Sequence, residues 1–325
     1  MTAPLLAVEG LTTEFATKAG ILRAVNGVSF EVARGEVMGL VGESGSGKTV
    51  TGFSILGLID PPGRVTGGSV RLDGQELVGL PGGAMRAIRG KRIAMVFQDP
   101  AMTLNPVLSI GTQMGLAIRA HANMSEAKAR QHMAAVLTRV GIPDAARRLD
   151  AFPHQFSGGM RQRVAIAMAL LHAPDLIIAD EPTTALDVSI QAQILAEVKS
   201  LVAETGMAMI WISHDLATVS SLAHRIAVMY AGRIVEQGPA VAVLRQPRHR
   251  YTSGLLASLP SRAQPGAELV QIPGAPPSLT ALPPGCAFAP RCPRADRACE
   301  TLPAMTREGQ RVHACHHPVE AGEAA

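Results

Sequence analysis

The chain has 325 residues, of which 47% are hydrophobic and only 3% aromatic, so aliphatic side chains and methionine must fill its core. The formal net charge is +4, and the basic residues are spread along the chain without a Lys/Arg block, which argues against a nucleic-acid partner. No apolar run approaches the roughly 20 residues of a membrane-spanning helix, and the N-terminus lacks a secretory signal pattern. We therefore expect a protein of the cytosol.

Strands are expected in the N-terminal third wherever short apolar runs are bounded by glycine. Phe15 is expected in the loop after the first of them. Its ring is either a platform for an adenine base or a half-buried loop anchor, and the sequence leaves both open. A helix at residues 50–59 should end at the prolines that follow it. The expected strands are residues 5–8, 23–30, 36–41, 68–72 and 92–97.

A glycine-rich loop between a strand and a helix predicts a nucleotide-phosphate site. The loop fits the pattern G-x-x-x-x-G-K-[ST], in which small residues let successive backbone N–H groups and a helix N-terminus point at phosphate oxygens. In this interpretation Lys48 reaches the β- and γ-phosphates, and the Thr49 hydroxyl binds Mg²⁺. The loop consists of Gly42, Glu43, Ser44, Gly45, Ser46, Gly47, Lys48 and Thr49.

Residues 110–148 have a helical pattern that interrupts the alternation of strands and helices, so we expect a helical insertion in a parallel α/β domain. Ser125 and Glu126 are suited to starting one of its helices. Further on, Ser157 is a predicted N-cap, and Gly158 and Gly159 open a strongly periodic helix. This second helix N-terminus carries no bulky side chain, which favours a second anion site over a plain capped helix.

A continuous apolar run at residues 176–179 ends in Asp180 and Glu181, which is typical of a strand buried on both faces. Acids at the carboxyl end of a parallel strand lie where open α/β sheets bind ligands. Asp180 suits the Mg²⁺ shell, and Glu181 is placed to orient or deprotonate an attacking water. His214 follows the next buried strand, at residues 207–212, and is a candidate contact to the γ-phosphate.

Six motifs together resemble the ATP-binding subunits of ABC transporters, and the match extends over nearly the whole chain. A GTPase or kinase is excluded because it has no use for a signature motif or a switch histidine, and the chain has no Asn-Lys-x-Asp motif. The six are, in chain order, Walker A (42–49), the Q-loop (Gln98), the signature motif (157–161), Walker B with its catalytic glutamate (176–181), the D-loop (185–187) and the switch histidine (His214).

The resemblance implies an α/β fold: a P-loop NTPase of the ABC ATPase type. Its parts would be a RecA-like parallel sheet core, an N-terminal antiparallel β subdomain and a helical insertion, followed by a loop-rich C-terminal extension. The expected boundaries are residues 1–245 for the nucleotide-binding domain, about 100–170 for its helical subdomain, and 246–325 for the extension.

The resemblance also implies that two such domains close head to tail on ATP and Mg²⁺. One chain supplies the phosphate loop and also Asp180, Glu181, His214, Gln98 and Phe15. The metal would be bound by Thr49, Gln98 and Asp180. The partner supplies the far wall, so a single chain cannot complete its own site. The residues acting in trans are Ser157, Gly158, Gly159, Met160 and Asp187.

Finer features resemble the oligopeptide/dipeptide/nickel importer branch. They include the methionine in the signature motif and a C-terminal motif His-Pro-Tyr-Thr, which appears here with Arg250 in place of proline. The branch implies three kinds of partner: two integral membrane permeases, a second ATPase subunit that is either identical or different, and an extracytoplasmic solute-binding protein. It implies a peripheral place on the cytoplasmic face of the inner membrane and the uptake of di- or oligopeptides or related small solutes. The alternative is a non-transport ABC ATPase acting with soluble partners.

All four cysteines lie in the Pro- and Gly-rich tail, which should have little regular structure. In a reducing compartment such clustering favours metal ligation over disulfides. Four thiolates can hold Zn²⁺ or a [4Fe–4S] cluster, and the absence of a C-x2-C pair favours the cluster. The resemblance points the same way; unligated cysteines are the remaining alternative. The cysteines are Cys286, Cys292, Cys299 and Cys315, with His313, His316 and His317 as further ligands if zinc is bound.

Overall fold

The computed structural model describes residues 3–184, 186–262, 268 and 270–320. The chain forms two compact units. Unit 1 comprises residues 1–32, 37–78 and 211–325, and unit 2 comprises residues 33–36 and 79–210. Among the described residues, no helix combines the length and the apolar character needed to cross a membrane.

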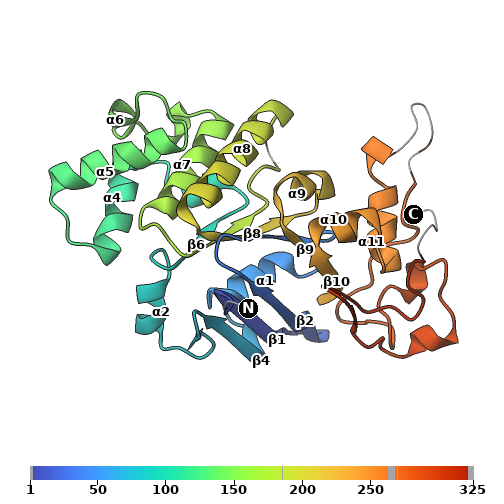
Figure 1. The fold of residues 1–325 in the computed structure, drawn as a ribbon. Helices are drawn as coiled ribbons and strands as arrows, with labels where there is room; N and C mark the ends of the chain where they lie inside the picture. Colours follow the sequence, from blue (N-terminus) through green and yellow to red (C-terminus); the bar gives the residue numbers. More distant parts are fainter. Residues whose placement is uncertain (1–2, 185, 263–267, 269, 321–325) are drawn as a thin grey trace. The chain divides into compact units, whose positions relative to one another are not determined.

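The N-terminal part of unit 1 is an antiparallel sheet in the order β2-β1-β4-β5 (Figure 1). This confirms the predicted antiparallel β subdomain. The Thr13 hydroxyl on β1 lies 2.7 Å from the Ser54 hydroxyl on α1, so this helix packs on the sheet. The elements are β1 (Leu6–Thr17), β2 (Gly20–Val32), α1 (Lys48–Ile55), β4 (Gly63–Leu72) and β5 (Gln75–Glu76).

The prediction that Phe15 lies in a loop is wrong, because β1 continues to Thr17. Irregular pairing between Val8 and Thr13 accommodates Gly10 without ending the strand. At Phe15, β1 is paired with β2 on one side and with β4 on the other. The half-buried ring covers Gly63 on β4, where an added Cβ would lie 2.4 Å from the Phe15 ring.

The second sheet of unit 1 contains β3, β9, β10, β12 and β11. The β3 strand is fully buried and runs parallel to β9, whereas β10, β12 and β11 follow as antiparallel neighbours. Helix α9 lies so close to β3 that a Cβ at Gly39 would be 2.2 Å from a Val219 methyl. The elements are β3 (Val37–Val41), α9 (Leu216–Leu222), β9 (Arg225–Tyr230), β10 (Arg233–Pro239), α10 (Ala240–Arg245), α11 (Arg250–Ala257), β11 (Thr306–Glu308) and β12 (Arg311–His313).

The C-terminal extension is mostly loop, as predicted, and its little regular structure includes a short hairpin. Strands β11 and β12 turn at Gly309, which has a φ of +61°, and β12 pairs with β10. Strands of three residues are too short to show periodicity in sequence. The rest contains three short 3₁₀ turns: η2 (Pro260–Arg262), η3 (Ala289–Arg291) and η4 (Arg297–Glu300).

Unit 2 combines a parallel strand pair, β6 and β7, with the predicted helical insertion, which is confirmed (Figure 1). Ser125 immediately precedes α5, and the Ser109 hydroxyl caps α4 by accepting from the Thr112 N–H. The elements are α2 (Gly82–Ile88), β6 (Ile93–Val96), α3 (Pro100–Thr103), α4 (Ile110–His121), α5 (Glu126–Arg139), α6 (Ala145–Arg148), η1 (Pro153–Gln155), α7 (Gly158–Leu170), β7 (Leu176–Asp180) and α8 (Val188–Thr205); β8 (Ala208–Ser213) begins in unit 2 and ends in unit 1.

Candidate ATP site and cysteine cluster

The glycines of the phosphate loop let it lie directly against neighbouring backbone. A Cβ at Gly42 would be 2.2 Å from the Met229 carbonyl, and one at Gly47 would be 2.2 Å from the Ala24 carbonyl. Gly47 also has a φ of +103°, which side chains rarely adopt. The Ser46 carbonyl accepts a hydrogen bond from the Gly232 N–H at 2.9 Å. The loop is therefore packed between β2 and the carboxyl end of β9 within unit 1.

Lys48 opens α1 and is buried, with 5% of its surface exposed. Its ammonium donates to the carbonyls of Gly42 and Glu43, at 2.7 and 3.0 Å. The ammonium is thus held against the backbone of the phosphate loop. It lies at the start of α1, where helical N–H groups have no partner inside the helix. The half-buried Thr49 follows in the first helical turn.

A connection that the sequence did not reveal holds Glu43 to the C-terminal extension. Its carboxylate accepts hydrogen bonds from both terminal nitrogens of Arg291, at 2.7 and 3.0 Å, and its N–H donates to the Tyr251 hydroxyl at 2.9 Å. The hydrogen bonds from Arg291 to the Glu43 carboxylate raise the pKa of the Arg291 guanidinium. Arg291 directly precedes Cys292 in the sequence, but no local pattern links it to the distant Glu43.

In unit 2, Asp180 is the buried last residue of β7, as predicted, and Glu181 follows it in a left-handed conformation with a φ of +44°. Such backbone strain is concentrated at functional sites. The Glu181 carboxylate accepts from the Thr184 hydroxyl at 2.9 Å and lies 3.5 Å from the amide nitrogen of the exposed Gln98. The structure thus brings Gln98 and Glu181 together.

The signature motif begins α7 as predicted, because the Ser157 hydroxyl accepts from the Met160 N–H at 3.3 Å. Gly158 is exposed, and a Cβ at Gly159 would lie 2.8 Å from an Ile190 methyl on α8. This close approach fixes the helix start against α8. Exposed Asp187 precedes α8, whereas Ala185 of the D-loop lies outside the described residues.

His214 follows β8 directly and is exposed, as a γ-phosphate contact requires. The next residue, Asp215, begins α9 by accepting from the Ala217 N–H at 2.8 Å. The position of His214 at a strand end therefore agrees with the sequence prediction.

The four cysteines gather in unit 1. The Cys286 N–H donates to the Cys299 carbonyl at 3.0 Å. Burial raises the pKa of Cys286, Cys292 and Cys315, and neighbouring thiols add to it: Cys299 and Cys315 act on Cys286, Cys299 on Cys292, and Cys292 on Cys315. These influences connect all four thiols into one group of neighbours.

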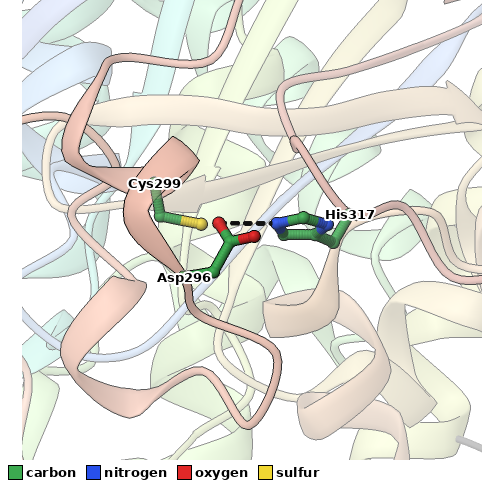
Figure 2. Close-up of side chains that lie close together, drawn as sticks. All are labelled: Asp296, Cys299 and His317. Carbon is green, nitrogen blue, oxygen red and sulfur yellow. Dashed lines mark ion pairs between the residues drawn. The ribbon is translucent and has the colours of Figure 1, made fainter.

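Figure 2 shows a group that the sequence analysis only partly identified: Asp296, Cys299 and His317. Their ligand atoms lie within 4.8 Å of one another, and His317 Nε2 is 2.9 Å from Asp296 Oδ1. His317 lowers the pKa of Asp296 by hydrogen bonding. Among the described residues this is the one such group of three, and it includes only one cysteine. The cysteines are thus spread more widely than ligands of one zinc ion would be.

Comparison with known proteins decides the family. The ABC transporter family model matches residues 25–184, and the oligopeptide/dipeptide transporter C-terminal region matches residues 235–299. The chain is 48% identical over 316 residues to the dipeptide transport ATP-binding protein DppD of Bacillus subtilis, which covers 97% of this chain and 93% of DppD. This chain belongs to the ATP-binding subunits of ABC transporters. The oligopeptide transport protein OppD of Salmonella typhimurium is 46% identical, covering 97% of this chain and 94% of OppD.

Solved ABC cassettes share the fold. A dimeric structure of the ATP-binding cassette MJ0796 bound to ADP and Pi is 28% identical, with a TM-score of 0.65, covering 72% of this chain and 98% of that cassette. The cassette cbiO1 of Clostridium perfringens gives a TM-score of 0.63 at 27% identity, covering 74% of this chain and 91% of its own. The chain is an ATPase that uses ATP and Mg²⁺, and its family works as dimers with membrane permeases.

The C-terminal motif of this ABC subunit begins α11. The fully buried His249 ring accepts from the Tyr251 N–H at 3.0 Å, and its pKa falls to about 3 because of burial. The buried Glu236 carboxylate accepts from the N–H groups of Arg248 and His249. Arg250, which replaces the family's proline, donates to the His317 carbonyl at 2.9 Å. The replacement therefore fastens α11 to the cysteine-bearing tail.

Proposed function

We propose that this ATPase powers the uptake of di- or oligopeptides through two partner permeases. The observation that carries the proposal is the 48% identity to DppD, which extends through both the cassette and the C-terminal extension. A non-transport ABC ATPase would have no need of an extension typical of oligopeptide and dipeptide transporters, which matches at residues 235–299.

In this proposal ATP is held by the phosphate loop, with Lys48 on the β- and γ-phosphates and Phe15 beneath the adenine. Thr49, Gln98 and Asp180 surround Mg²⁺. Glu181 activates the attacking water and His214 contacts the γ-phosphate. The exposed Ser157 and Gly158 at the start of α7 support a role in trans, because a partner's phosphates can reach an exposed helix N-terminus. The trans residues are Ser157, Gly158, Gly159, Met160 and Asp187.

The proposed assembly contains a second ATPase subunit, either identical or different, and an extracytoplasmic solute-binding protein. It places the chain on the cytoplasmic face of the inner membrane. We assign residues 1–245 to the nucleotide-binding domain, about 100–170 to its helical subdomain and 246–325 to the extension.

Purification of the tagged chain from its own membranes in mild detergent tests this assembly. Mass spectrometry should identify two integral membrane permeases and an ATPase partner in stoichiometric amounts. Recovery of soluble partners alone would contradict the importer and favour the alternative function.

We further propose that the four cysteines hold a [4Fe–4S] cluster, which would act structurally by cross-linking the loops of the extension. The mutual influence of the four thiols supports a shared centre, and their wide spacing favours a cluster, in which each thiolate binds a different iron. Zinc at Asp296, Cys299 and His317 is the competing occupant.

Metal analysis after anaerobic purification separates these occupants. Brown protein with four irons and four sulfides per chain is expected. Cys292→Ser should remove iron and sulfide, whereas Asp296→Asn should keep both. Colourless protein with stoichiometric zinc, lost in Asp296→Asn, would replace the cluster with a zinc site, and metal-free protein would leave the cysteines without a ligand role.

A further inference from the structure

The C-terminal extension reaches the phosphate loop through one side chain, Arg291. Its two terminal nitrogens donate hydrogen bonds of 2.7 and 3.0 Å to the Glu43 carboxylate, which makes a bidentate pair. Only 5% of the Arg291 side chain is exposed, compared with 26% for Glu43. Bidentate charge-assisted pairs of this kind are strong and fix orientation as well as distance. The pair is therefore largely buried, and we expect it to be stronger than an exposed ion pair on the surface.

Arg291 makes two further hydrogen bonds. Its Nε donates to the Pro273 carbonyl at 2.9 Å, and Nη1 also lies 3.3 Å from the Tyr230 hydroxyl. The residue ends the short turn η3, where its own N–H donates to the Phe288 carbonyl. The guanidinium thus has one defined position, set by Pro273 of the extension together with Tyr230 and Glu43.

A cluster of three aromatic rings lies next to the contact between Glu43 and Arg291. Tyr230, Tyr251 and Phe288 are each at most 2% exposed, and their ring centroids lie 4.5 to 5.4 Å apart. The Tyr251 hydroxyl accepts the Glu43 N–H at 2.9 Å. Both the side chain and the backbone of Glu43 are therefore held by residues from outside the loop.

Glu43 stands at the start of the phosphate loop, and its carbonyl accepts from the Lys48 ammonium at 3.0 Å. A carboxylate here is an anion beside the place where ATP phosphates bind. Pairing with Arg291 neutralises that charge and fixes the loop entry. Loss of the arginine would leave an unpaired anion in the loop that binds an anionic ligand.

We propose that Arg291 is a positioning residue of the ATP site, through which the C-terminal extension sets the charge and geometry of the phosphate loop. It touches Glu43 rather than the nucleotide. Its removal should weaken ATP binding more than it slows turnover of bound ATP, since the groups that activate water lie elsewhere in the chain.

The test measures the affinity of the full-length protein for a non-hydrolysable ATP analogue, by calorimetry. Arg291→Gln should weaken binding about tenfold, and Arg291→Lys, which keeps the charge, should weaken it less. The double variant Arg291→Gln with Glu43→Gln removes both charges and should recover most of the affinity. Arg307→Gln, on the exposed strand β11, is the matched control and should bind as the unmodified chain does.

Steady-state ATP hydrolysis by the assembled transporter supplies the second readout: Arg291→Gln should raise KM about tenfold and change kcat less than threefold. Unchanged analogue affinity in Arg291→Gln would overturn the proposal. A double variant as weak as the single one would also overturn it, because the arginine would then serve only the fold of the extension. Neither outcome bears on whether the chain is an ATPase.

Discussion

The hydroxyl of Thr184 donates a hydrogen bond of 2.9 Å to the carboxylate of Glu181, across the turn that follows β7. Glu181 has a φ of +44°, so this turn holds the acid in a strained conformation. The proposed catalytic acid is thus oriented by a hydrogen bond within its own loop.

Replacing Glu181 with glutamine should leave ATP binding intact and abolish hydrolysis, because the amide cannot take a proton from water. The variant should accumulate as a closed dimer with ATP trapped inside. ATP binding, phosphate release and size-exclusion chromatography measure the three effects. Hydrolysis near the normal rate would remove Glu181 from the proposed role.

Thr184→Val should lower kcat about three- to tenfold with little change in KM, because the acid loses its orienting hydrogen bond while the phosphate loop is untouched. Thr184→Ser restores the hydroxyl and is the matched control, expected within twofold of the normal rate. Steady-state kinetics of the assembled transporter check both. Equal rates in the valine and serine variants would mean that the hydroxyl does not serve catalysis.

Gly47→Ala should abolish measurable ATP binding, since the new Cβ would meet the Ala24 carbonyl at 2.2 Å and displace the phosphate loop. Gly20 provides a control in the β1–β2 hairpin, because its φ is +118° but a Cβ there meets nothing within 4 Å. Both substitutions should lower the free energy of unfolding by about 1–3 kcal/mol through backbone strain. Gly20→Ala should nevertheless bind ATP normally. Normal binding by Gly47→Ala would show that the loop tolerates the shift.

Because His249 is buried and neutral, we expect the free energy of unfolding to fall in acid. Its pKa is about 3 in the folded protein and 6.5 in the unfolded chain, so the unfolded chain binds a proton first as the pH falls. Stability is therefore lost between pH 6.5 and 3, by about 1.4 kcal/mol at pH 5.5 compared with pH 7.5. Urea unfolding at the two pH values measures this.

Two variants separate the contribution of His249 from that of other groups. His249→Asn keeps a cap for α11 and should lower the pH-dependent loss by about 1.4 kcal/mol. His154→Asn, at an exposed position, should keep the full loss. The same pH dependence in the His249 variant and the unmodified chain would contradict the buried neutral ring.

The sequence predicted the elements that carry strong local patterns, such as the fully buried strand β7 and the Ser157 cap of α7. It placed Phe15 in a loop because glycine usually ends a strand, whereas pairing on both sides carries β1 past Gly10. The contact between Glu43 and Arg291 spans 248 residues and depends on the packing of the extension. No periodicity or spacing encodes such a contact.

The most direct test of the account is peptide uptake into proteoliposomes that contain the purified transporter and its solute-binding protein. Labelled di- or oligopeptide should accumulate only with ATP and Mg²⁺ on the ATPase side, and the Glu181→Gln transporter should bind ATP without accumulating peptide. Equal accumulation by the two transporters, or ATP hydrolysis without peptide uptake for any di- or oligopeptide that the binding protein holds, would contradict it.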